Sequence, residues 1–276
     1  MFRQDLLAIV RPRPSDTAGL IYAGGIDADG TIVGGKVRSP TSGEVYEVEN
    51  GYLDLLKARL CAYNAANLTN FLPGAGPAYE PLWRVRSLAL LTGEPFPTHR
   101  ELGMISDLAS LERGGRYLDL GCSAGLYTRG LARTLGEEGE VVGIDISPSM
   151  LREAVRRARK TGARPSLARA DAHELPFAAA SFSGVVCGGT LNELGDPARA
   201  LREASRVLEP GGRLAVMGIL RARSLRGRRL QRFLSIGGVR FFEPDELRSL
   251  LDHAGLDADP LRRHGPIFFA GATRRA

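Results

Sequence analysis

The sequence predicts an α/β fold in which a parallel sheet is covered by helices on both faces. From Arg100 onward, short apolar runs alternate with amphipathic stretches of about 10–15 residues, a pattern typical of strands that alternate with helices. Pro148, Pro197 and Pro244 each stand at the start of such a stretch, which is the helical position that tolerates proline. Alternation of this kind indicates a parallel sheet between two helical layers.

The first 98 residues have a different pattern. Glycines, turn pairs and short β-branched runs predict a small β-rich N-terminal module, residues 1–66, with a short helix at 53–66. Residues 67–98 are rich in proline and glycine and contain Trp83, the only tryptophan. A connector of this length with aromatic residues is expected to be functional, and we expect it to form a lid around Tyr79 and Trp83 together with residues 220–238.

Residues 99–276 are expected to form the main domain. Its predicted strands are residues 116–120, 140–144, 166–169, 184–187, 212–218 and a last one within 266–274. Its predicted helices are residues 126–135, 148–160, 197–208 and 244–254.

Composition excludes several classes of protein. A length of 276 residues with 43% hydrophobic residues suits a globular domain with a small appendage. The net charge of +6 is mild for a dedicated nucleic-acid binder, and three cysteines do not make a secreted disulfide framework. No stretch approaches the ~18 apolar residues of a membrane span, and the N-terminus lacks signal-peptide features, so we expect a cytoplasmic protein.

The strongest chemical signal is a glycine turn after the first strand of the main domain, in the run YLDLGCSAGLYT at 117–128. Glycine lets the backbone approach a ligand closely, and the free N–H groups at a helix start favour an anionic group. Asp145 ends the second strand, twenty residues after Gly125, where a carboxylate can accept hydrogen bonds from a ribose. Asp171 follows the third strand, at the same expected edge of the sheet.

Five separated blocks, LDLGCSAG, VVGIDIS, ADAHELPF, SFSGVVCGG and RVLEPGGRLAV, resemble class I S-adenosylmethionine-dependent methyltransferases. The similarity is strongest to the small-molecule branch that includes quinone-biosynthesis enzymes, and it covers roughly residues 98–272. It implies a Rossmann-like, seven-stranded, doubly wound sheet with a reversed final hairpin. It also implies S-adenosylmethionine as cofactor.

The resemblance assigns the methionine part of the cofactor to the glycine turn. Asp119 and Gly121 match the family motif that contacts this part, and Gly125 matches the last glycine of the turn. Ser123 departs from the family pattern, because a glycine is usual at this middle position. We expect serine to be tolerated, with less room at the methionine carboxylate.

The adenosine part is assigned to the next two strand ends. By the same resemblance, Asp145 holds both ribose hydroxyls and Ile146 lies beside adenine. Asp171 accepts from the adenine amino group, and Ala172 donates a backbone N–H.

The N-terminal module resembles a zinc ribbon that has lost its cysteines. Ser39 and Ser42 occupy the two cysteine positions of one knuckle, and residues 11–14 are the candidate for the other. Structural zinc needs about four closely spaced Cys or His ligands, so no metal site is expected. An unrelated β-rich module is an equally good interpretation.

Substrate-side residues are expected at the end of the fourth strand, because open α/β sheets bind ligands beyond the carboxyl ends of their strands. Thr190, Asn192 and Glu193 are the candidates there, although Asn192 and Glu193 could instead simply begin the next helix. His99, just before the main domain, is a further candidate, with a surface position as the alternative.

Six arginines lie between Arg221 and Arg232. They are consistent with a solvated helix whose apolar residues pack inward, while one or two arginines bind an anionic substrate. The apolar residues are Leu225, Leu230, Phe233 and Leu234.

The favoured function is methyl transfer to a small lipid-like or aromatic acceptor, with no nucleic-acid partner and an undetermined oligomeric state. One alternative is a ribosomal RNA methyltransferase, suggested by the ribbon and the arginines. It is disfavoured because no aromatic stacking residues alternate with the arginines. Another is a protein that binds the cofactor without transferring methyl.

Overall fold

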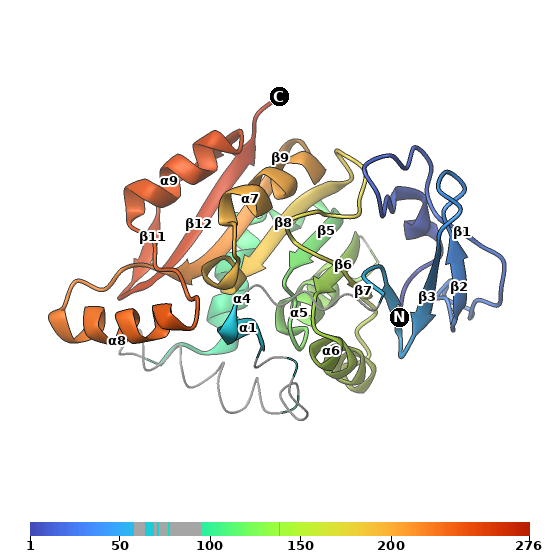
Figure 1. The fold of residues 1–276 in the computed structure, drawn as a ribbon, viewed down its shortest axis with the longest axis horizontal. Helices are drawn as coiled ribbons and strands as arrows, with labels where there is room; N and C mark the ends of the chain where they lie inside the picture. The colour runs from blue at the N-terminus through green and yellow to red at the C-terminus, as the bar shows by residue number, and fades with distance from the viewer. Residues whose placement is uncertain (58–63, 69–70, 72–76, 78–94, 138) are drawn as a thin grey trace.

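The computed structural model describes residues 1–57, 64–68, 71, 77, 95–137 and 139–276 (Figure 1). The N-terminal part contains a short 3-10 helix, η1, and four strands. These are η1 Asp5–Ile9, β1 Ile21–Tyr22, β2 Gly35–Arg38, β3 Val45–Glu49 and β4 Tyr52–Asp54. The four strands pair in sequence order as an antiparallel meander. The predicted helix at 53–66 is wrong at its start, because Leu53 lies in β4 and pairs with β3.

The main domain alternates strands with helices, as the sequence predicts. Its strands are β5 Gly115–Leu120, β6 Gly139–Asp145, β7 Ser166–Arg169, β8 Phe182–Gly188, β9 Leu208–Ile219, β10 Leu256–Ala258, β11 Arg262–His264 and β12 Ile267–Arg274. Its helices are α4 Thr98–Leu108, η4 Leu111–Arg113, α5 Leu126–Leu135, α6 Pro148–Thr161, η5 Thr190–Glu193, α7 Pro197–Val207, α8 Leu225–Ile236 and α9 Pro244–His253. Between the two parts lies α1, Ala65–Leu68. Every main-domain strand and helix that the sequence predicts is present, with ends that differ by a few residues.

Local sequence signals explain where the helices begin and end. In α6, Pro148 occupies the first turn, the Ser147 side chain accepts from the backbone N–H of Met150, and Gly162 ends the helix at φ 69°. At the start of α7, the Asp196 side chain accepts from the N–H of Arg199. These caps satisfy backbone groups that a helix end leaves unpaired.

The described strands form one sheet in the order β1-β2-β3-β4-β7-β6-β5-β8-β9-β12-β10, and β11 pairs with β12. Strands β7, β6, β5, β8 and β9 run parallel, whereas β12 is antiparallel to both β9 and β10. The N-terminal meander is continuous with this sheet, because β4 pairs with β7 in parallel, with Leu53 opposite Ala168. The small β-rich part therefore extends the main sheet at one end.

Apolar side chains cover both faces of the sheet. One face packs against α7, α9 and the N-terminal residues, through buried residues such as Leu201, Leu247 and Phe2. The opposite face packs against α4, α5 and α6, through residues such as Leu131 and Leu151. Burial on both faces explains why the parallel strands are almost continuously apolar. No helix among the described residues is long and apolar enough to cross a membrane.

Candidate active site

The glycine turn that follows β5 has a left-handed backbone at three positions. The φ angles are 72° at Gly121, 50° at Ser123 and 78° at Gly125. A Cβ atom at Gly121 would collide with the side chain of Thr190, whose hydroxyl donates to the Gly121 carbonyl at 3.0 Å. This close approach joins the end of β5 to the segment after β8. Glycine is required at Gly121 for both its backbone angle and its neighbour.

Ser123 is strained, because left-handed backbone costs a non-glycine residue roughly 1–2 kcal/mol. This angle explains why glycine is usual at the equivalent position of the resembling family. The Ser123 backbone N–H donates to Oδ2 of Asp145 at 2.8 Å, and its hydroxyl lies 3.5 Å from the Met150 sulfur. The strained turn therefore directs an N–H group at the carboxylate that ends β6.

Asp145 is partly exposed at the end of β6. Its Oδ1 accepts from the N–H of Ser147 at 2.8 Å, while Oδ2 accepts from Ser123. Burial raises the pKa of the Asp145 carboxyl above its usual value, although these backbone N–H groups favour the ionised form. An ionised carboxylate offers about four acceptor positions, so the backbone donors of Ser123, Ile146 and Ser147 still leave it capacity to accept from a ribose hydroxyl.

Asp119 has a different environment from Asp145. Its carboxylate is buried and accepts from both the backbone N–H (2.9 Å) and the hydroxyl of Thr128 in α5. These bonds hold the first turn of α5 against the end of β5. The contact with the cofactor that the resemblance implies for Asp119 stays a prediction, and the structure gives the residue a role in positioning the turn.

Asp171, after β7, is oriented by His173. Oδ1 of Asp171 accepts from the backbone N–H of His173 at 2.7 Å and lies 2.9 Å from its Nδ1. The His173 Nε2 atom accepts from the N–H of Asp196 at 3.1 Å, so Nδ1 carries the proton and donates to Asp171. His173 is buried. The sequence alone did not reveal this positioning role.

Arg169, the last residue of β7, connects the predicted adenine side to the N-terminal strands. Its side chain is buried, and Nε donates to the carbonyl of Ile146 at 3.0 Å. Nη1 lies 3.2 Å from the Asp54 carboxylate in β4 and also donates to the Lys57 carbonyl. Sequence reasoning missed this residue, since no local pattern reveals a pairing with a carboxylate more than a hundred residues earlier.

We use the name cofactor edge for residues 121–125, 145–147 and 171–173, which follow β5, β6 and β7. The structure brings together here all eight residues predicted for the cofactor. They are Asp119, Gly121, Ser123, Gly125, Asp145, Ile146, Asp171 and Ala172, each at or next to the carboxyl end of one of three neighbouring strands.

We use the name acceptor edge for residues 189–193 and 219–224, which follow β8 and β9. Asn192 is buried there, and its amide is fully engaged within the protein. Its Nδ2 donates to the carbonyls of Ile219 (2.9 Å) and Arg240 (2.6 Å), and its Oδ1 accepts from the N–H of Ile219 (2.8 Å). These bonds indicate that Asn192 holds two chain segments together, and its predicted contact with substrate remains untested.

The remaining substrate-side candidates have separate positions. Thr190 is partly exposed beside Gly121, and the Glu193 carbonyl accepts from the Asn64 side chain at 2.7 Å. His99 is exposed in the first turn of α4, and no contact among the described residues joins it to Thr190 or Asn192. Tyr79 and Trp83, the predicted lid residues, lie outside the described residues.

A buried pair between α4 and α5 was not anticipated as part of the site. The Tyr127 hydroxyl donates to Glu101, and both side chains are buried. A Cβ atom at Gly188, the last residue of β8, would collide with the Tyr127 ring. This pair fixes α4 against the helix that begins at the glycine turn.

The predicted inward packing of the apolar residues in α8 is wrong. Leu225, Leu230, Phe233 and Leu234 are all exposed, as is Ile236. The buried residue of α8 is Gln231, whose side chain accepts from the N–H of Ala222 at 2.8 Å and donates to the Leu220 carbonyl at 2.9 Å. A polar side chain, which forms two backbone hydrogen bonds, attaches this helix to the domain where apolar packing was expected.

Hydrogen bonds link the two segments that the sequence suggested as ribbon knuckles. Ser39 is fully buried, its hydroxyl donates to buried Asp16 at 2.8 Å, and its oxygen accepts from the N–H of Ser42 at 3.1 Å. Arg13, in residues 11–14, also forms an ion pair with Glu44, which follows the Ser39–Ser42 segment. In the part of the chain that the structure describes, no three metal-binding side chains gather in one place.

Comparison with known proteins gives consistent results. Residues 118–216 match the family model described as a methyltransferase domain. The chain is 40% identical over 114 residues to a 2-phytyl-1,4-naphthoquinone methyltransferase of Thermosynechococcus vestitus, covering 41% of this chain and 50% of that protein. It is 39% identical over 113 residues to the ubiquinone/menaquinone biosynthesis C-methyltransferase UbiE of Yersinia enterocolitica, covering 40% and 45%. The chain thus spans about half the length of these relatives.

Among solved structures, the phosphoethanolamine N-methyltransferase 2 of Haemonchus contortus, in complex with S-adenosyl-L-methionine, superposes with a TM-score of 0.63. The match covers 80% of this chain and 61% of that one at 16% identity, so it shows a shared fold. The family match and the two relatives support a methyltransferase domain that uses S-adenosylmethionine.

Proposed function

We propose that this protein transfers a methyl group from S-adenosylmethionine to a small lipid-like or aromatic acceptor. The observation that supports this most strongly is the cofactor edge, where a left-handed turn aims an N–H group at Asp145 and leaves that carboxylate with unused acceptor positions. The names of the two relatives, both methyltransferases of quinones, favour an acceptor of this class.

The residues present fit the cofactor. We infer that Asp145 holds the ribose hydroxyls, that Asp171 and the N–H of Ala172 recognise adenine beside Ile146, and that the turn at 121–125 holds the methionine part. When bound, S-adenosylmethionine supplies a methyl group activated by its sulfonium. The protein contributes position and alignment, and His173 and Arg169 keep the adenine side in place.

We also infer that Thr190 and the segment after β8 face the acceptor, because Thr190 contacts the glycine turn directly. In this proposal the run β7-β6-β5-β8-β9-β12-β10 is the seven-stranded methyltransferase sheet, and β1–β4 form an added module that resembles a ribbon without zinc. The hydrogen bonds of Asp16 support that interpretation, because this carboxylate accepts from Ser39 in one predicted knuckle and from the N–H of Arg13 in the other.

Transfer from methyl-labelled S-adenosylmethionine tests the proposal. Purified protein is incubated with the labelled cofactor and either an organic-solvent extract of cells or total RNA. We expect the label in the organic-soluble fraction, and Asp145→Ala should abolish it while the exposed-site control Glu137→Ala should not. Label in RNA would favour an RNA methyltransferase. Binding of S-adenosylhomocysteine without any transfer would indicate a cofactor-binding protein.

A further inference from the structure

Helix α8 exposes an apolar surface that a soluble helix normally buries. Leu225 is 77% exposed, Phe233 is 71% exposed and Ile236 is 81% exposed, and Leu230 and Leu234 are also exposed. In Figure 1, α8 lies at the end of the molecule opposite the N-terminal strands. Five large, exposed apolar side chains on one twelve-residue helix are a concentration of apolar surface of the kind that marks an interaction site.

Arginines lie among these apolar residues. At 100° per residue, Gln231 faces the domain, and Phe233, Ile236, Arg226 and Arg229 share the opposite side of the helix. Arg226, Arg229 and Arg232, together with Arg223 just before the helix, form no ion pair with a carboxylate of the described residues. Long arginine side chains can place their guanidinium groups at the level of lipid phosphates while neighbouring apolar side chains enter the boundary below, so a mixed outer face of this kind suits an anionic membrane surface.

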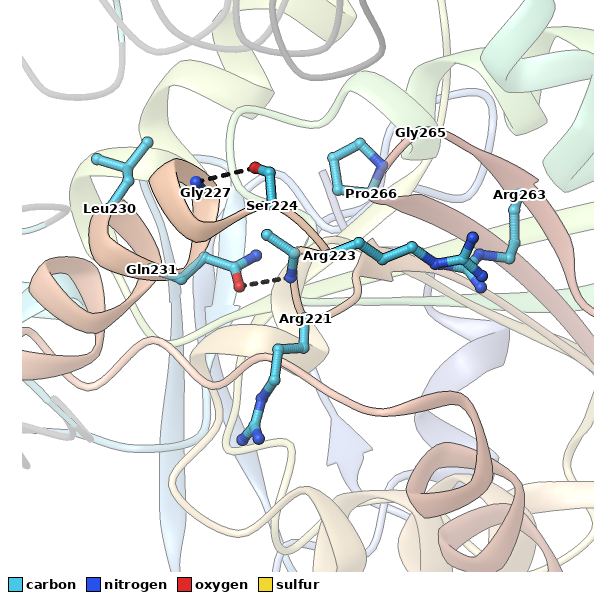
Figure 2. Close-up of a pocket in the computed structure, with 10 residues that line it drawn as sticks. Arg221, Arg223, Ser224, Gly227, Leu230, Gln231, Arg263, Gly265 and Pro266 are labelled. Carbon is cyan, nitrogen blue, oxygen red and sulfur yellow. Dashed lines mark hydrogen bonds between the residues drawn. The ribbon is translucent and has the colours of Figure 1, made fainter.

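The cationic surface continues into a neighbouring cavity of about 660 Å³. The cavity lies between the start of α8 and the turn before β12, and its lining includes Arg221, Arg223, Arg263 and Leu230, with no acidic residue among the described lining residues. Figure 2 shows the side chain of Arg223 extending toward Arg263. Arg221 lies 3.6 Å from Glu243, so Arg223 and Arg263 provide the donors for an anionic group.

From this arrangement we infer that α8 docks the protein on an anionic phospholipid surface. The apolar side chains enter the boundary between headgroups and acyl chains, and the arginines bind lipid phosphates, including one in the cavity beside Arg223 and Arg263. Two other occupants fit less well. A second copy across a two-fold axis would bring like charges together, and RNA would gain little from exposed Leu and Ile side chains.

The geometry gives docking a consequence for the site. Residues 219–224 connect the carboxyl end of β9 to α8, and they belong to the acceptor edge. Gln231 fixes α8 to this connection through the backbone of Leu220 and Ala222. A membrane under α8 therefore lies next to the edge where the proposed acceptor binds. The inference itself is independent of the proposed methyl transfer, because vesicle binding requires no turnover.

Co-sedimentation of the full chain with vesicles tests the inference. We expect binding to phosphatidylcholine vesicles that contain phosphatidylglycerol, and much weaker binding to phosphatidylcholine alone. The double variant Phe233→Ser/Ile236→Ser should lower the partition coefficient about tenfold or more. Each of Arg226→Gln and Arg229→Gln should lower it about fivefold, with a loss that grows with salt.

Two matched controls separate this role from general effects. Val33→Ser removes an equally exposed apolar side chain from the N-terminal part, and Arg152→Gln removes an exposed arginine from α6. Neither should change vesicle binding, and all variants should keep their affinity for S-adenosylhomocysteine. Equal binding to both vesicle types, or equal losses in the controls, would overturn the inference. Dimerisation through α8, measured by sedimentation velocity, would also overturn it. The same holds if the protein binds RNA more tightly than anionic vesicles and the α8 variants abolish that RNA binding.

Discussion

The cofactor edge and the acceptor edge belong to the same sheet but are built differently. At the cofactor edge, backbone N–H groups of Ser123 and Ser147 approach Asp145 from residues that follow strand ends directly. At the acceptor edge, the Asn192 side chain connects segments 27 and 48 residues away. The first edge is therefore built from backbone donors at consecutive strand ends, the nearer of them 2 residues and the farther 22 residues from Asp145, and the second depends on one buried side chain that joins two other segments.

This comparison predicts that Asn192→Ala affects stability more than Asp145→Ala at the cofactor edge. The variant leaves the partly buried N–H and carbonyl of Ile219 and the carbonyl of Arg240 without these partners, at a cost of about 2–4 kcal/mol. Urea unfolding measures the free energy, with Asn192→Asp as a variant that keeps the acceptor for Ile219. Unchanged stability together with lost methyl transfer would instead make Asn192 a catalytic residue.

Asp145→Ala should leave folding nearly intact and weaken the binding of S-adenosylhomocysteine. Loss of charge-assisted hydrogen bonds to the ribose costs about 2–3 kcal/mol, or about 30- to 160-fold in affinity. Calorimetry measures the affinity, and Glu137→Ala, an exposed acid outside the site, is the control. A wild-type protein that does not bind S-adenosylhomocysteine would overturn the cofactor assignment.

Binding of S-adenosylhomocysteine should also depend on pH through Asp145. Because burial raises the pKa of this carboxyl, affinity should fall, by up to about tenfold per pH unit, as the pH drops through that raised pKa. The contribution of Asp145 to the free energy of unfolding changes with pH in the opposite direction to this affinity. A raised pKa means the folded state holds its proton more tightly, so this contribution weakens as pH rises through the same window. Asp145→Asn should flatten the affinity profile, and a profile that stays sloped would assign it to another group.

In the N-terminal part, Ser39→Ala should cost about 1–3 kcal/mol, because the buried Asp16 carboxylate loses a donor. Thr41→Ala, at an exposed neighbour in the same turn, should cost little.

Elemental analysis should find no stoichiometric zinc, and chelators should leave the melting temperature unchanged. One zinc per chain would show that the two segments are a working metal site.

The smallest effect is expected at Ser123. Ser123→Gly removes the strain of a left-handed serine, and it should stabilise the protein by up to about 1 kcal/mol. Ser110→Gly, at φ 54° before η4, relieves the same strain outside the site and should give a similar gain. If only Ser123→Gly also changes S-adenosylhomocysteine affinity, the serine limits the room for the cofactor.

The sequence predicted what short spacing determines. The main-domain strands and helices, the glycine turn and the acids at 119, 145 and 171 follow from local patterns and were found in place. Contacts between distant segments could not be anticipated in this way. Arg169 pairs with Asp54, 115 residues earlier, and the apolar residues of α8 are exposed because Gln231 faces the domain. Helical periodicity gives the relative directions of side chains, but it does not say which direction faces the core.

The pairing of β4 with β7 has a consequence for synthesis on the ribosome. The chain's first strands emerge early, yet the strand that pairs with β4 lies more than a hundred residues later. At about 5–20 residues per second, β4 waits on the order of ten seconds with one edge unpaired. Until β7 emerges, an open β edge is available to other nascent chains. Strand β4 is only three residues long and ends in Asp54, and a short edge with a charged residue discourages such pairing during the delay.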